Sequence, residues 1–104
     1  MATVNWTQRA QYALEDLHDY LRREAPFYAG HILQQIVASV DRLEEHPLSG
    51  RKVPEAERED IREVIFQHYR IIYWVVTDDR IDILSVIHGS RDLTRTHNQP
   101  WDAH

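Results

Sequence analysis

Cysteine is absent from this 104-residue chain, which excludes disulfide bonds, thiolate chemistry and cysteine-based zinc sites. Long apolar runs are absent too. The longest, IIYWVV at 71–76, has six residues, whereas a membrane-spanning helix needs about 20. The chain opens with MATVNWTQ, without the basic and then apolar start of a secretory signal. We therefore expect a cytoplasmic protein that does not enter a membrane.

An excess of positive charge is also missing. The chain has 12 basic and 17 acidic residues and a net charge of −5. Clustered Lys and Arg provide much of the affinity for nucleic acid, so no extended nucleic-acid surface is expected. The histidines show no H-x-x-x-H or similar ligand spacing, and we expect neither a metal nor a cofactor.

The first half of the sequence reads as a strand followed by two helices. TVNW at 3–6 is β-branched and aromatic, which favours a short strand. Thr7 can cap a helix over about 7–23, where apolar residues recur with helical spacing. Pro26 suits the first turn of a second helix, whose apolar stripe extends to Leu43 and which ends before Pro47 and Gly50. The short connection EAP predicts an antiparallel helical hairpin.

The second half changes to strand periodicity. Three runs rich in Ile, Val and aromatic residues, at 61–67, 69–76 and 81–88, are separated by QH and by the turn signal TDDR. They predict a three-stranded antiparallel C-terminal sheet with 69–76 at its centre. The expected fold is a two-layer α+β domain with the order β-α-α-β-β-β. A single domain spans 1–104, and its polar tail begins at about residue 94.

The motif VIHGSRD at 86–92 brings polar side chains together at the end of the last run. A triad of His88, Ser90 and Asp92 is not favoured, because neighbours on an extended chain point to opposite faces and no G-x-S-x-G elbow is present. The motif is instead typical of the end of a strand, where Gly89 frees the backbone.

Four stretches, taken in order, resemble the ParE/RelE superfamily of bacterial toxins from toxin–antitoxin, or plasmid stabilisation, modules. They are W…A…DL…YL within 6–21, LEEHPLSGRKVPE at 43–55, IREVIFQHYRIIYWV at 61–75 and IDILSVIHGSRDL at 81–93. The resemblance implies a sheet curved against a helical hairpin. It also implies a cognate antitoxin whose disordered C-terminal segment folds onto the toxin, and it leaves a homodimer or a hetero-oligomer with the antitoxin open.

Two branches of this superfamily carry out different activities. The RelE-like branch cuts mRNA on the ribosome, which needs a base, an acid and cations for the phosphate. The ParE-like branch acts by binding DNA gyrase. Where many RelE-like nucleases place lysines this chain has Ile61 and Glu63, and no tyrosine follows His88. We therefore favour a ParE-like gyrase inhibitor; a RelE-like endoribonuclease and a non-toxic interaction module remain alternatives.

No residue is favoured as catalytic; a nuclease would use Arg70, His88 and Arg91. A binding toxin is predicted to contact its target through Arg70, Tyr73, His88 and Arg91. Arg70 in an apolar strand is costly unless paired, so an ion pair with Glu63 or Asp82 is an equal expectation. His88 is expected more as a strand-end histidine that bonds locally than as a base. In the tail, Trp101 either pins the tail to the domain or is exposed for a partner.

Overall fold

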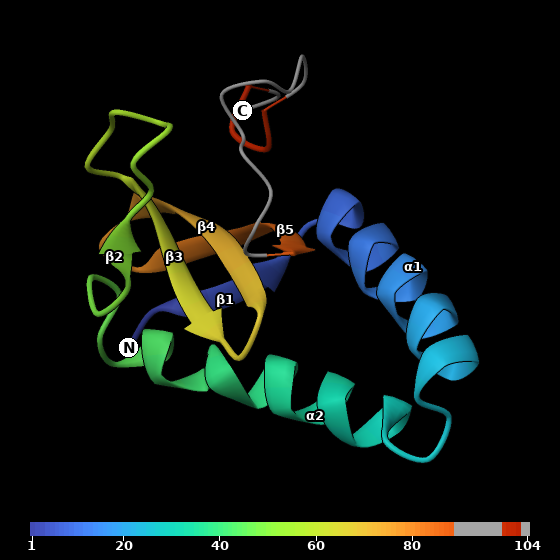
Figure 1. Ribbon diagram of the computed structural model, residues 1–104. Coiled ribbons are helices and arrows are strands. Elements are labelled where there is room, and N and C mark those ends of the chain that lie inside the picture. The colour runs from blue at the N-terminus through green and yellow to red at the C-terminus, as the bar shows by residue number, and fades with distance from the viewer. Residues whose placement is uncertain (89–98, 103–104) are drawn as a thin grey trace.

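The computed structural model describes residues 1–88 and 99–102. Its secondary structure, in chain order, is β1 (Thr3–Trp6), α1 (Gln8–Glu24), α2 (Ala29–Ser39), the 3₁₀ helix η1 (Asp41–Glu44), β2 (Arg51–Lys52), β3 (Ile61–Phe66), β4 (Tyr69–Thr77) and β5 (Arg80–His88). The strands form one sheet in the order β1-β5-β4-β3-β2, with β4 in the middle (Figure 1). The α+β class is confirmed.

The sheet is larger than the predicted three-stranded one. β3, β4 and β5 pair antiparallel as expected, but β1 joins the sheet parallel to β5 and β2 joins it antiparallel to β3. The result is a five-stranded mixed sheet. A strand of two residues such as β2 is too short to show an alternating pattern, and the pairing of β1 joins segments almost a whole chain apart, which no local signal reports.

Local signals place the start of α1 correctly. The Thr7 side-chain oxygen accepts a hydrogen bond from the Ala10 amide at 3.2 Å, and its hydroxyl donates to the Ile83 carbonyl at 2.6 Å. This N-cap satisfies one of the free amides of the first turn and ties it to β5. Among the described residues no helix is long and apolar enough to cross a membrane.

The second helix begins later than predicted. Residues 26–28 form a turn, so Pro26 lies in the connection and α2 starts at Ala29. Beyond Ser39 the apolar stripe continues into η1, where Leu43 is fully buried. In Figure 1, α1 and α2 are close together at their connection and diverge from it. The helical hairpin is therefore more open than the sequence predicted.

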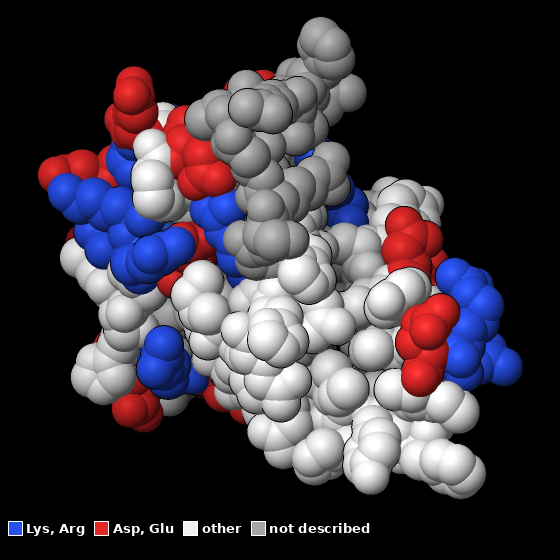
Figure 2. Space-filling model, in the orientation of Figure 1, with Lys and Arg blue, Asp and Glu red and all other residues white. Residues whose placement is uncertain are grey.

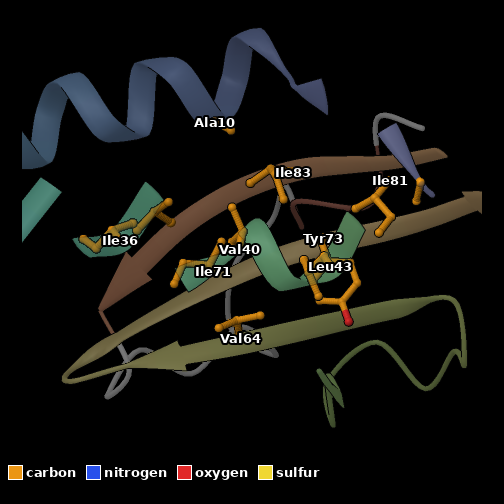
Figure 3. Packing of buried hydrophobic residues seen from close by; sticks show 11 residues of the cluster. Ala10, Ile36, Val40, Leu43, Val64, Ile71, Tyr73, Ile81 and Ile83 are labelled. Carbon is orange, nitrogen blue, oxygen red and sulfur yellow. The ribbon is translucent and has the colours of Figure 1, made fainter. Parts of the chain in front are cut away.

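Two clusters cover the two faces of the sheet. The face under α1, α2 and η1, called here the helix face, holds the larger cluster, which Figure 3 shows between the strands and helices. Its buried residues are Ala2, Ala10, Ile36, Val40, Leu43, Val64, Ile71, Tyr73, Ile81, Ile83 and Val86. The opposite face, called the far face, holds a smaller cluster whose buried residues are Val53, Ile61, Ile72, Leu84 and Trp101.

Candidate functional site

Arg70 lies on β4 between two glutamates. Its Nε donates to Glu63 Oε1, and its Nη1 and Nη2 donate to the two carboxylate oxygens of Glu55, each at 2.8 Å. The other oxygen of Glu63 accepts from Arg51 Nε on β2. Two arginines and two glutamates therefore form one neutral network, which links β2 and the loop after it to β3 and β4. We call it the Arg70 network.

The Arg70 network leaves its central arginine little surface. The side chains of Arg70 and Glu63 are 6% and 0% exposed. The hydrogen bonds with Glu55 are the main cause that raises the pKa of Arg70, so its charge is held firmly in place. The predicted pairing with Glu63 is confirmed. The Asp82 alternative is wrong, because that carboxylate accepts both bonds of Arg80.

Tyr73, predicted to contact a target, is instead part of the core. Its side chain is fully buried, and its hydroxyl donates to the Pro47 carbonyl at 2.7 Å and accepts from the Gly50 amide at 3.0 Å. Burial raises the pKa of Tyr73. A Cβ on Gly50 would lie 2.6 Å from both the Tyr73 hydroxyl and the Glu63 carbonyl oxygen, so only glycine fits there. Tyr73 therefore fastens the turn before β2 and has no surface for a target.

His88 is exposed at the end of β5. Its ring is stacked on His68, with centroids 6.2 Å apart, and meets Tyr69 edge-on at 6.1 Å. A hollow of about 220 Å³ adjoins it, lined by Leu17, Tyr20, Tyr69, Val86, Ile87 and His88. The expectation that His88 makes local contacts agrees with this geometry. Arg91, the remaining predicted residue, lies outside the described residues.

Arg70 and His88 lie on opposite faces of the sheet. Residues paired across antiparallel strands point to the same face. Tyr69 pairs with His88 and packs against the helix-face cluster, whereas Arg70 pairs with Ile87, which packs against the far-face cluster. The sheet itself therefore separates the two side chains that a nuclease would have to use together.

A second surface was missed in the sequence, although its signal was present. Residues 25–40 contain no Asp, Glu, Lys or Arg. In Figure 2 charged side chains gather on the β2 side and near the end of α1, while an uncharged area spreads over α2 between them. A groove of about 430 Å³ between α1 and α2 is lined by Leu14, Leu33, Gln34, Val37, Ala38 and Asp41. Such a concave apolar surface is suited to an amphipathic segment of a partner.

Within residues 1–88 and 99–102, no three His, Asp or Glu side chains converge in a way that could hold a metal ion. What the geometry offers is binding surface: the α1/α2 groove on one side and the His88 end of the sheet on another.

The chain belongs to the ParE toxin family of type II toxin–antitoxin systems, the parDE kind, whose family model matches residues 4–93. Among curated relatives, the Y4kP protein of Sinorhizobium fredii is 31% identical over 88 residues, 83% of this chain and 86% of that protein. Toxin RelE2 of Caulobacter vibrioides is 29% identical over 91 residues, 88% of this chain and 99% of that protein.

Solved structures agree on the fold. The chromosomal ParDE system of P. aeruginosa superimposes with a TM-score of 0.71 at 23% identity, over 85% of this chain and 96% of that chain. The RelBE2 toxin–antitoxin complex of Mycobacterium tuberculosis gives a TM-score of 0.60 at 25% identity, over 84% and 96%. The similarity thus extends to proteins of both names, and the choice between the two activities depends on the site.

Proposed function

We propose that this toxin acts in the cytoplasm by binding DNA gyrase and inhibiting it, and that a cognate antitoxin neutralises it. The observation that carries the proposal is the separation of Arg70 from His88. Phosphoryl transfer to a 2′-hydroxyl needs cations and proton-transfer groups around one phosphate. Here the arginine is buried and neutralised on the far face, while the histidine is exposed at the end of β5 and points to the helix face.

Electrostatics favours the same conclusion. Glu63 lies on the far face beside Arg70, where a phosphate would have to approach, and its carboxylate would repel that phosphate. The guanidinium is already saturated by Glu55 and Glu63, so an incoming phosphate would have to displace two carboxylates. Inhibition by binding requires only complementary shape and charge, which the exposed end of β5 and the helical surface can supply.

The gyrase proposal is tested with two parallel assays on the purified toxin. We expect inhibition of gyrase supercoiling at stoichiometric toxin, and no codon-specific cleavage of mRNA in a reconstituted translation system. Cleavage that is lost on Arg70→Lys, in a chain that still folds by circular dichroism, would replace the proposal with a RelE-like ribonuclease. The similarity to Toxin RelE2 is the observation that favours that second candidate. If cells that express the protein do not stop growing, and the purified protein neither inhibits gyrase nor cleaves mRNA, the non-toxic interaction module is the remaining explanation.

The antitoxin is proposed to bind in the α1/α2 groove. Its apolar lining, the absence of charge over 25–40 and the toxin–antitoxin complexes among the similar structures support this assignment. We expect an apolar antitoxin segment to bind with nanomolar affinity or tighter and with a large negative heat-capacity change.

A matched pair of lysine substitutions locates the antitoxin surface. Val37 lines the groove and Leu48 lies outside it, and both are exposed apolar side chains. Val37→Lys places a charge in the apolar contact and should weaken binding in calorimetry by about tenfold or more, a loss of about 1.4 kcal/mol. Leu48→Lys should leave the affinity unchanged. Equal effects of the two substitutions on affinity would mean that the antitoxin does not bind in this groove.

A further inference from the structure

The C-terminal residues Gln99–Asp102 lie against the far face of the sheet, beyond the residues 4–93 that the family model matches. Trp101 is 7% exposed and is a member of the far-face cluster. Of the two expectations for Trp101, the structure places it against the domain. A buried tryptophan removes about 150–250 Å² from water, among the largest apolar contacts that one side chain can make.

Gln99–Asp102 makes polar contacts in addition to the apolar contact of Trp101. The Asp102 amide donates to the Gln99 carbonyl at 3.0 Å, and the Gln99 amide donates to Asp102 Oδ2 at 3.2 Å. These two bonds close a turn within the segment. A third comes from α1, where Arg9 Nη1 donates to the Gln99 carbonyl at 3.3 Å. The segment is no strand of the sheet, and its tryptophan is the residue that joins the far-face cluster.

The far-face cluster that Trp101 joins combines strand residues with residues of an irregular loop. The cluster includes Val53 and Ala56 from the loop that follows β2. The Val53 amide donates to the Ile61 carbonyl at 3.2 Å and the Ala56 amide to the Val53 carbonyl at 3.1 Å. Glu55, a member of the Arg70 network, belongs to the same loop. Trp101 therefore shares one cluster with the loop that carries Glu55 of the network.

We propose that Gln99–Asp102 is an intramolecular strap, anchored by Trp101, that closes the far face over the β2–β3 loop. A strap of this kind opens as a local unit while the sheet and the helices stay folded. Closed, it withdraws the far-face cluster from partners and leaves the α1/α2 groove and the His88 end of β5 as binding surfaces. This inference goes beyond the proposed function and does not depend on which target the toxin binds.

Hydrogen exchange of the full-length Trp101→Ala chain, followed by mass spectrometry, tests the strap. We expect the hydrogen-bonded amides of Val53 and Ala56 to exchange faster by an order of magnitude or more, with unchanged protection in α1 and α2. Trp101→Phe, which keeps an aromatic anchor, should retain most of the protection. The control is Phe27→Ala, which removes an aromatic ring that is 95% exposed and should change nothing at 53–56.

Two outcomes would overturn the proposal. Unchanged exchange at 53–56 in the Trp101→Ala chain would mean that the segment does not close the far face. Faster exchange throughout, including α1 and α2, would mean that Trp101 is an integral part of one cooperative core and that no separate strap exists.

Discussion

Replacing Arg70 by methionine should destabilise the fold more than any other single change in the Arg70 network. Methionine keeps an apolar stem of similar reach but no charge. Glu63, with no exposed side-chain surface, would keep a single ionic partner, and Glu55, 13% exposed, would lose its paired bonds. Removing one partner of a buried ion pair costs about 3–5 kcal/mol, because the other charge stays buried without compensation. That is a large share of the roughly 5–15 kcal/mol that holds a domain folded.

Arg51 provides the matched control, because it binds the same carboxylate from an exposed position. Its side chain is 62% exposed while that of Glu63 is 0% exposed. Exposed ion pairs contribute about 0–1 kcal/mol. Arg51→Met and Arg70→Met each remove one arginine from Glu63, and Arg70→Met also removes the paired bonds to Glu55. The difference between the two variants, roughly 2–5 kcal/mol, therefore measures what burial and the pair with Glu55 add together.

Urea unfolding followed by circular dichroism measures both variants. With an m-value of about 1–3 kcal/mol/M, a loss of about 3 kcal/mol lowers the midpoint by about 1–3 M. The melting temperature should fall by about 12 °C or more. Arg70→Met combined with Glu63→Gln should regain part of the loss, since the network then again holds equal numbers of positive and negative charges. Equal midpoints for Arg51→Met and Arg70→Met would refute the assignment of the network as a buried support of the fold.

Three further predictions concern the exposed end of the sheet, a turn and the acid limit of stability. His88→Gln should leave growth arrest largely intact, whereas Arg91→Glu should weaken it. Growth arrest is scored in cells, and circular dichroism checks that each variant folds. The reverse pattern would favour a ribonuclease, in which loss of a general base lowers the rate by about two to four orders of magnitude. Gln67 in the β3–β4 turn has a φ of 52°, so Gln67→Gly should raise the free energy of unfolding by up to about 1 kcal/mol and shift the urea midpoint upward; a lower midpoint would contradict strain there. Hydrogen bonds from Arg58 lower the pKa of Asp60, so its contribution to stability is present above about pH 4 and is lost as the pH falls through the lowered pKa. Asp60→Asn should make the melting temperature fall less steeply with decreasing pH in the acid range. An unchanged slope of melting temperature against pH would exclude the Arg58–Asp60 pair as its cause.

Much of the fold could be predicted because its signals are local. The cap at Thr7 and the helical spacing after it define α1 within one residue of its observed start. The continuous apolar run of β4 indicated the middle of the sheet, and β4 is the middle strand of five. The buried arginine implied a carboxylate partner, and Glu63 is that partner. Even the missed α2 surface had a readable signal, the charge-free run at 25–40.

The candidate site, in contrast, was decided by register and by contacts between distant segments. Arg70 and His88 both lie near strand ends in the sequence, and only the pairing of β4 with β5 assigns them to opposite faces. A shift of one residue in that pairing would exchange the faces, and nothing in the local sequence reports it. From the sequence, Tyr73 was predicted to contact a target. In the structure, the turn at Pro47 and Gly50 covers its hydroxyl and buries it. Composition and periodicity determined which elements form; the tertiary structure decided which side chains remain on the surface, because burial depends on what the rest of the chain packs against them.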